Sequence, residues 1–416
     1  MRKLEKHEFP SFVEIVVNAY PGFAQNTVEF KERYTNSLIS VQENVESIDF
    51  FGLFRDDKLV GGMRIHYFTM NLYGSMVAAG GVGLVAVDLL HKKEKIAKEM
   101  IDYFISYFKE NGASIVLLYP FRPDFYKQMG FGYSTKMNQY NIEPSSFPKV
   151  LKKEGLTFLN ASHKELIMNC ANKYAKANHG MILKTENDVE VMFKNPDHKI
   201  VGFIENDILQ GYLIFTFKNV SQDNFLINHL IIKEFIYESP KALTQLCGFL
   251  NSQADQIDRI VLNTQDDDIQ YLIRDPRNGS NHLIPSVYHE TNTSGIGLMY
   301  KIINIEAFFK QLPSGHFSDL TCEIGLIIHD TFQSNQPQKW LLSLEKGCLS
   351  IEENDQHETE IEMELDIADF SSLAMGTIDI NKLYQYGRVK IRKPEYVTII
   401  KKLFNHVQKP ICTTSF

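Results

Sequence analysis

The pattern of apolar and polar positions is clearest in residues 82–133, where it predicts a strand, a helix and a second strand. Residues 82–87 and 115–119 are uninterrupted apolar runs, typical of buried parallel strands. Between them, apolar side chains recur at helical spacing: Ile96, Met100, Ile101, Phe104, Ile105 and Phe108. Asn111-Gly112 then ends the helix, as a glycine after the last turn does. This order predicts the parallel crossover unit of an α/β fold.

Other segments extend this pattern towards the N-terminus. Residues 11–20 and 27–37 have the periodicity of two helices. Residues 50–54 and 59–68 predict a hairpin, because the turn between them, residues 55–58, contains two aspartates. Gly80-Gly81 leads into the central apolar run.

The hairpin and the crossover unit both recur later in the chain. Aligning residues 51–65 with residues 201–215 places Gly52 on Gly202 and Asp57 on Asp207. Residues 115–117 likewise match residues 260–262, Ile-Val-Leu in both places. The recurrence predicts a duplicated domain. Residues 144–148, a Pro/Ser cluster, mark the first boundary.

The last part of the chain has a different order of elements. Residues 320–329, 340–344, 349–351 and 361–367 predict strands, and the last of these alternates apolar with acidic side chains. Residues 370–375 and 397–407 predict helices. We therefore expect three domains, covering residues 1–146, 147–298 and 299–416, with an overall α/β (α+β) fold class.

Composition narrows the functional classes. The 416 residues are 44% hydrophobic and 23% charged, as in soluble globular proteins of several domains. A net charge of −8 disfavours nucleic acid and favours cationic small molecules. We find neither a membrane-spanning run nor a signal peptide, and expect a cytoplasmic protein with no membrane partner. The five scattered cysteines predict reduced thiols, and without an HExxH-type cluster we expect no catalytic metal.

The turn before the central helix is the first candidate for chemistry. Lys92, Lys93 and Lys95 lie at the predicted helix N-terminus, where the helix dipole disfavours positive charge unless an anion is bound. A phosphate-bearing ligand would explain them, and a solvated lysine-rich turn is the alternative. The residues alone leave both interpretations open.

The same segment resembles motif A of the GNAT acetyltransferases, V-x-V-x-P-x-x-R-x-x-G-x-G/A, through Val85, Val87 and Ala97. The resemblance implies acetyl-CoA as cosubstrate, with its pyrophosphate held by loop amides. Leu89, Lys92 and Lys95 depart from the motif, and Lys95 adds a Cβ where glycine lets a phosphate approach closely. By this resemblance the cofactor-binding residues are Leu84, Val85, Ala86, Val87, Lys92, Lys93, Glu94, Lys95, Ile96, Ala97, Lys98, Phe121 and Arg122.

Residues 125–131, Phe-Tyr-Lys-Gln-Met-Gly-Phe, resemble the F-Y-x-x-x-G-F segment of the same family, whose tyrosine lies near the CoA sulfur. The alternative for Tyr126 is a half-buried ring whose hydroxyl is satisfied elsewhere. In this family the sheet splays at the central strand, and the resemblance implies irregular backbone at Gly80-Gly81. Helices after the first strand wall the acceptor site in the family. Tyr20, Phe23 and Glu29 are therefore candidates for substrate contact, although packing explains each of them better.

The whole chain resembles the Eis (enhanced intracellular survival) acetyltransferases, which join two tandem GNAT-like domains to a sterol-carrier-protein-like domain and end at an active-site carboxylate. The resemblance implies Tyr126 as general acid, the Phe416 carboxylate as base, and a hexamer. Residues 234–240 are acidic where the first copy has lysines, so we expect the second copy to lack a cofactor. In the third domain, a lipid-binding site and a packing module are alternatives, and we favour packing.

The predicted function is transfer of an acetyl group from acetyl-CoA to a primary amine of a cationic acceptor, such as an aminoglycoside, a polyamine or a lysine. An aminoacyl transferase is a second possibility, but it needs a tRNA-binding surface that the acidic balance opposes. A non-catalytic CoA or lipid sensor, or a scaffold, is the alternative from a different class.

Overall fold

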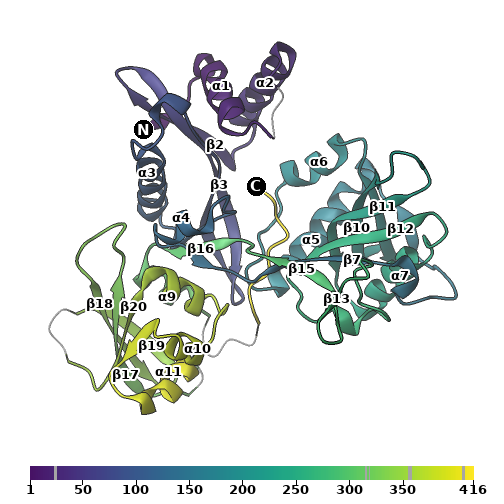
Figure 1. The fold of residues 1–416 in the computed structure, drawn as a ribbon. Coiled ribbons are helices and arrows are strands. Elements are labelled where there is room, and N and C mark those ends of the chain that lie inside the picture. Colours follow the sequence, from purple (N-terminus) through teal and green to yellow (C-terminus); the bar gives the residue numbers. More distant parts are fainter. Residues whose placement is uncertain (23–25, 314–315, 318, 355–357, 405–407) are drawn as a thin grey trace. The chain divides into compact units, whose positions relative to one another are not determined.

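The computed structural model describes residues 1–22, 26–313, 316–317, 319–354, 358–404 and 408–416. The chain divides into two compact units (Figure 1). The first contains Met1–Ser134, Gly297–Pro410 and Thr414–Phe416, and the second contains Thr135–Ile296 and Ile411–Thr413. Among the helices of the described ranges, none combines the length and apolarity that crossing a bilayer requires.

The first unit is built around a seven-stranded sheet with the order β1-β2-β3-β4-β5-β16-β6. Its strands are β1 (Arg2–Lys3), β2 (Ile48–Arg55), β3 (Lys58–Leu72), β4 (Ser75–Val87), β5 (Ile115–Leu118), β6 (Gly132–Tyr133) and β16 (Met299–Ile302). Its helices are α1 (Phe9–Ala19), α2 (Val28–Asn44), α3 (Ile96–Glu110) and α4 (Pro123–Lys127). Only β4 and β5 of this sheet pair in parallel, joined through α3, which confirms the predicted crossover unit.

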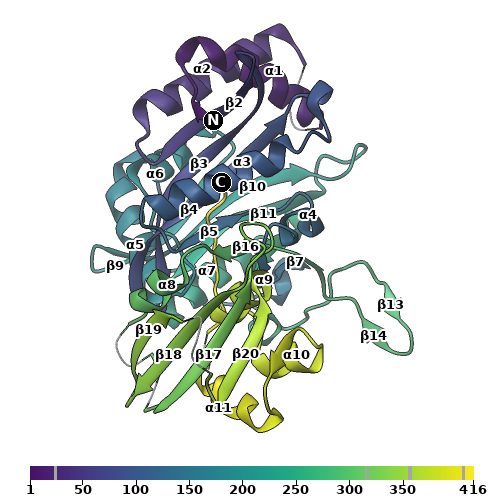
Figure 2. The same ribbon diagram turned by 90° about the vertical axis from the view of Figure 1, so that its left-hand side faces the viewer.

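Two apolar cores lie on opposite faces of this sheet. On one face α1 packs its buried residues against Phe50, Leu59 and Ala86, and on the other α3 packs against Phe51, Met63 and Val82 (Figures 1 and 2). Alternation along the strands sends successive side chains to the two cores. The sheet is therefore covered on both faces, as an α/β fold requires.

The second unit has its own seven-stranded sheet, with the order β15-β7-β12-β11-β10-β9-β8. Its strands are β7 (Met137–Ile142), β8 (Leu156–Phe158), β9 (Lys199–Glu205), β10 (Ile208–Asn219), β11 (Asn228–Tyr237), β12 (Ile257–Thr264) and β15 (Asn292–Gly295), beside a separate hairpin of β13 (Leu283–Ile284) and β14 (Tyr288–His289). Helices α5 (Lys164–Ala177) and α6 (Glu186–Lys194) pack into one core, and α7 (Pro240–Asn251) packs into the other.

The two hairpins aligned in the sequence have the same turn. Asp56 and Asp57 have φ of 47° and 59°, and Asn206 and Asp207 have φ of 52° and 61°. Two successive positive φ values define a type I′ turn, which Asp and Asn tolerate better than other side chains. A register shift follows each turn, next to Gly61 in one hairpin and Gly211 in the other. The predicted duplication is thus present in backbone geometry as well as in sequence.

The third segment of the fold belongs to the first unit. It has a five-stranded sheet of order β19-β18-β17-β20-β21, formed by β17 (Cys322–His329), β18 (Gln338–Glu345), β19 (Cys348–Glu353), β20 (Ile361–Asp366) and β21 (Val389–Ile391). Its helices are α8 (Ile305–Gln311), α9 (Ile367–Ala374), α10 (Ile380–Gln385) and α11 (Val397–Leu403). Residues 405–407, which the sequence also places in the last helix, lie outside the described residues.

Helix α9 joins this segment to the first sheet. All eight of its residues are buried, including Ser371 and Ser372. The Ser371 hydroxyl accepts a hydrogen bond from Ile302 N (3.0 Å) in β16, and the Ser372 hydroxyl donates to Tyr133 O (2.9 Å) in β6. Because α9 is buried on all sides, it belongs to the core that this segment shares with the first sheet.

The order of the strands along the chain does not follow a simple series of domains. β7 follows β6 directly in sequence but lies in the second sheet, and β16, which follows the second unit, lies between β5 and β6 in the first. The domain limits expected at 146/147 and 298/299 stay predictions. All five cysteines are free thiols, as expected.

A buried ion pair stabilises the segment after α4. Lys301 is fully buried, and its ammonium donates to Met129 O (2.9 Å) and pairs with the Asp330 carboxylate (2.8 Å). Burial lowers the Lys301 pKa, and Asp330 offsets part of that effect. Removing one partner of such a pair leaves an uncompensated buried charge.

We expect Lys301→Met to lower the free energy of unfolding by about 3–5 kcal/mol, because it leaves Asp330 buried and unpaired. Lys310→Met removes the exposed pair with Glu306 and should change stability by no more than about 0.5 kcal/mol. Urea unfolding of both variants measures the difference. Equal losses would mean that the Lys301 pair is solvated in solution.

Candidate functional site

The site begins where β4 and β5 part. Their parallel pairing runs from Ala79–Ile115 to Val82–Leu118, but β4 continues to Val87 with β3 as its neighbour. Within this extension Leu84 has a φ of 51°, beside a register shift opposite Gly62 and Arg64. The side of β4 that faces away from β3 therefore has no strand partner, among the described residues, over Leu84, Val85, Ala86 and Val87. We call this side the unpaired edge of β4. The irregular backbone lies at Leu84 rather than at the glycines.

Gly80 and Gly81 instead pair regularly with both neighbouring strands. A Cβ on Gly80 would meet the Phe108 ring at 2.5 Å, and one on Gly81 would meet the Phe68 ring at 2.3 Å. These glycines therefore make room for aromatic rings on the two faces. The expectation of irregular backbone at this pair was wrong.

The lysine-rich turn leads from this edge into α3. Lys92, Lys93, Glu94 and Lys95 are exposed, and Glu94 contacts the His91 ring (2.9 Å). No side chain caps α3, so the amides of its first turn, at Ile96, Ala97 and Lys98, are not bound by a capping residue. Ile96 is buried and Ala97 half-buried, while Lys98 is exposed. An uncapped helix N-terminus among lysines can bind an anion.

Lys95 itself has a left-handed backbone, with a φ of 63°, and Lys93 has a φ of 71°. A side chain in this region costs on the order of 1 kcal/mol, which glycine would avoid. Lysine therefore occupies a left-handed position that glycine would adopt without this cost.

Tyr126 lies on α4, 3% exposed, in the same apolar cluster as Val85, Val87 and Ala97. Its ring is edge-on to Phe121 at 5.6 Å and to Phe131 at 6.1 Å. Burial raises the Tyr126 pKa, with a smaller effect from the nearby Tyr20, so the hydroxyl keeps its proton at neutral pH. The structure thus places Tyr126 beside the motif A strand.

Two flanking candidates differ in their surroundings. Phe121 is 62% exposed, with one edge of its ring against Tyr126. Arg122 is exposed and paired with Asp124 at 2.5 Å, which raises the Arg122 pKa through that hydrogen bond. Of the helix candidates, Tyr20 donates to Val85 O (2.6 Å), whereas exposed Glu29 lies in the first turn of α2 and Phe23 lies outside the described residues.

Phe416 lies against β3 and β4 in the first unit. Its ring centroid is 5.4 Å from that of His66, 5.0 Å from Phe68 and 5.2 Å from Tyr119. The Tyr119 hydroxyl donates to Thr414 O (3.0 Å). A Cβ on Gly83 would lie 3.4 Å from the carboxyl carbon of Phe416. The chain end therefore lies next to the start of the unpaired edge of β4.

The three residues before this end are bound within the second unit. Ile411 N donates to His179 O (2.9 Å), and Cys412 N donates to Gln265 Oε1 (2.6 Å). The Thr413 hydroxyl donates to Glu234 (3.3 Å), a buried carboxylate that also pairs with Lys184 (2.9 Å). The last three residues, Thr414–Phe416, belong to the first unit.

Sequence reasoning missed two polar groups of β3. Arg64 and His66 face Phe416, and Arg64 Nε and His66 Nε2 are buried without a hydrogen-bond partner among the described residues. Burial lowers both pKa values, and Arg64 lowers that of His66 further, so the imidazole is neutral at pH 7. Their signal was available, because both interrupt the apolar run of residues 59–68 at alternate positions.

The matching helix start in the second unit is closed. Ser239 caps α7 by accepting from Ala242 N (3.2 Å), and Pro240 removes one amide from the first turn. Glu238 pairs with Lys173 beside it. A capped and acidic helix start offers no comparable place for an anion.

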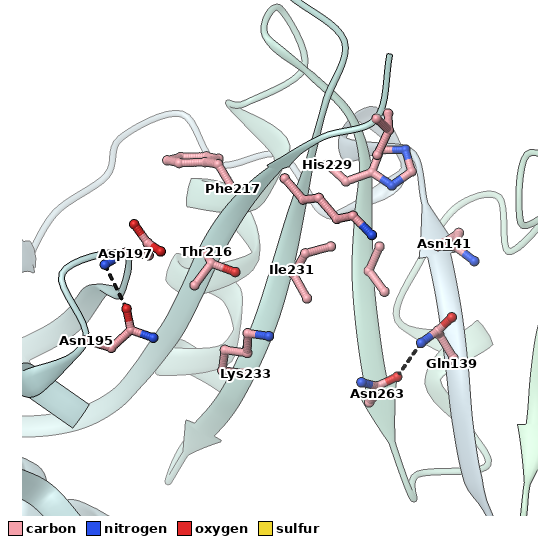
Figure 3. Close-up of a pocket in the computed structure, with 13 residues that line it drawn as sticks. Gln139, Asn141, Asn195, Asp197, Thr216, Phe217, His229, Ile231, Lys233 and Asn263 are labelled. Atoms are coloured by element: carbon pink, nitrogen blue, oxygen red, sulfur yellow. Dashed lines mark hydrogen bonds between the residues drawn. The ribbon is translucent and has the colours of Figure 1, made fainter. Parts of the chain in front are cut away.

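A polar hollow of about 630 Å³ opens elsewhere on the second sheet, between β7, β10, β11 and β12 (Figure 3). Its lining includes Lys233, His229 and Thr216, and the Gln139 amide donates to Asn263 (3.0 Å). His229 is held by Asp258 (3.2 Å). None of the residues predicted from the sequence lines this hollow.

Comparisons with known proteins match each segment. Models of GNAT acetyltransferase domains match residues 1–134 and 180–291, and a sterol carrier protein domain matches residues 305–413. Among curated proteins, no sequence matches significantly.

Solved structures share the whole fold. A GCN5-related N-acetyltransferase from Anabaena variabilis ATCC 29413 has a TM-score of 0.80 at 16% identity, covering 100% of this chain and 99% of that one. Eis1 from Mycobacterium abscessus has a TM-score of 0.76 at 17% identity, with coverage of 100% and 99%. A GCN5-related N-acetyltransferase from Kribbella flavida has a TM-score of 0.73 at 15% identity, with coverage of 98% for both chains.

We expect Lys95→Gly to raise the free energy of unfolding by about 1 kcal/mol, because it removes the cost of a left-handed side chain. Lys98→Gly is the matched control within α3 and should lower it by about 1 kcal/mol. Thermal and urea unfolding measure both variants. Loss of stability in both would contradict the left-handed conformation of Lys95.

Proposed function

The chain is an acyltransferase of the GNAT family with the Eis-like arrangement of two GNAT domains and a sterol carrier domain, and from this premise we propose that it transfers an acetyl group from acetyl-CoA to a primary amine. The observation that carries the proposal is the convergence of Tyr126, the unpaired edge of β4 and the chain end in one unit.

The residues around β4 and α3 fit acetyl-CoA. The uncapped first turn, Ile96 to Lys98, offers amides to the pyrophosphate, and Lys92, Lys93 and Lys95 add positive charge. The edge from Leu84 to Val87 offers backbone groups to the pantetheine arm and the thioester carbonyl. When bound, acetyl-CoA would supply an acetyl group activated as a thioester.

Two groups of this chain would move protons. An alkylamine is protonated near neutral pH, with a reference pKa of about 10.4, and must lose a proton to attack. The Phe416 carboxylate would hold the ammonium and take that proton, directly or through water. The Tyr126 hydroxyl, kept protonated by burial, would donate a proton on the leaving-group side.

We propose one cofactor site per chain, in the first GNAT domain. The capped start of α7 and the acidic side chains beside it support a structural second domain without cofactor. The alternative of a non-catalytic sensor or scaffold is disfavoured by the two matching acetyltransferase domains.

The finer expectations are also proposals. The acceptor is a cation before it reacts, as the net charge of −8 favours, and aminoglycosides, polyamines and lysines all belong to this class. By family resemblance we propose a homo-oligomer, a hexamer. From the reduced thiols we propose a cytoplasmic location. The third domain is proposed to act as a packing module because its α9 is wholly buried.

The test combines acetyl-CoA binding with amine-dependent release of CoA. Calorimetry should give one site per chain, and release of CoA should require an amine. Tyr126→Phe should lower kcat by about 10²- to 10⁴-fold, because it removes the hydroxyl that would donate the proton. It should change acetyl-CoA affinity little, because the ring stays in place. Tyr103→Phe, on the sheet-facing side of α3, is the control. If Tyr126→Phe lowers affinity and kcat equally, Tyr126 has a structural role.

A further inference from the structure

The strongest unexplained feature of the site is the pair of unsatisfied polar groups on β3. His66 is 6% exposed and its Nε2 has no hydrogen-bond partner among the described residues, as is also true of the buried Nε of Arg64. Leaving a buried donor unpaired costs about 1–3 kcal/mol, and more when it is charged. Two such groups side by side indicate a polar ligand that satisfies them.

Charge decides the kind of ligand. A guanidinium stays protonated in proteins, so Arg64 is a cation. Its resolved electrostatic neighbours are the Tyr34 hydroxyl and the neutral His66 ring, neither of which is an anion. A charge in partly dry surroundings requires a counter-charge. Arg64 therefore favours an anion.

The Phe416 carboxylate is the nearest candidate on the chain itself. Arg64 Nη2 and the carboxyl carbon of Phe416 lie 3.5 Å and 3.4 Å from the position that a Cβ on Gly83 would take. No ion pair joins these two residues in the described structure, so the guanidinium is beside the carboxylate without clamping it. The two groups thus present opposite charges to one point next to β4.

We infer that the acceptor is a primary amine that also carries an anionic group, either a carboxylate or a phosphonate-like oxyanion. Its ammonium binds at the Phe416 carboxylate, and its anion binds at Arg64, with His66 Nε2 as a further polar contact. The inference rests on the proposed function and changes its acceptor class, from an amine of net positive charge to one whose ammonium is balanced by an anion. It disfavours aminoglycosides and polyamines, which bring several positive charges to a site that already contains Arg64.

The substrate pairs that test this differ only in the anion. β-Alanine and aminoethylphosphonate are each compared with ethylamine, γ-aminobutyrate with propylamine, and lysine with cadaverine. Spermidine and tobramycin represent polycations. The untagged full-length chain is assayed for amine-dependent release of CoA, and kcat and KM are measured for each acceptor.

We expect kcat/KM to be about 10- to 100-fold higher for the anionic member of at least one pair, mainly through a lower KM. Arg64→Gln should remove this preference, and Arg64→Lys should keep part of it, because a single charge replaces a fork of donors. Arg55→Gln, which removes an exposed pair with Glu99, should leave the preference intact. Whether aminoethylphosphonate or β-alanine gains more over ethylamine shows which anion the site prefers.

The other outcomes overturn the inference in distinguishable ways. If plain amines or polycations are acetylated as well as the anionic ones, acetyl transfer stands and the anionic acceptor is wrong. If the preference survives in Arg64→Gln, the anion binds elsewhere. If no acceptor of either kind releases CoA, the proposed function itself fails. Acetyl-CoA affinity of each variant, measured by calorimetry, separates loss of fold from loss of acceptor.

Discussion

The separation of β4 from β5 after Val82 is the constraint on which the site depends. A parallel pair that continued to Val87 would use the backbone groups of Leu84 to Val87 in its own ladder. Because the pairing stops, the side of this extension that faces away from β3 has no strand partner among the described residues, although Val85 O already accepts from Tyr20. The turn at Lys93 to Lys95 carries the chain directly from that edge into α3. Tyr126 and Phe416 are far apart in the sequence, but both lie beside this part of β4.

Other contacts within the first unit fix the position of the segment that carries Tyr126. Lys301, from β16, holds the carbonyl of Met129 just after α4, and Asp369 of α9 holds Lys127 (3.2 Å) next to Tyr126. Arg388 completes that cluster by pairing with Asp369. The first two of these contacts join the segment that carries Tyr126 to residues after position 297. The sterol-carrier-like segment thus helps to hold the segment that carries Tyr126.

Periodicity in the sequence was enough to predict the elements, but not the pairing of distant strands. The crossover unit, the duplicated hairpins and the strand at residues 361–366 follow from local patterns of apolar side chains. The places of β7 and β16 do not, because a short strand has the same pattern in either sheet. Arg64 and His66 were missed for a related reason. Their alternation shows that they share a face, but only the return of Phe416 shows what that face meets.

We propose that the free carboxylate of Phe416 is part of the active site, and one added residue tests this role. A chain with a single alanine after Phe416 keeps every side chain but moves the carboxylate away from Gly83. We expect unchanged acetyl-CoA affinity by calorimetry and amine-dependent CoA release lower by about 100-fold or more. Undiminished release from the extended chain would show that the Phe416 carboxylate is not the base.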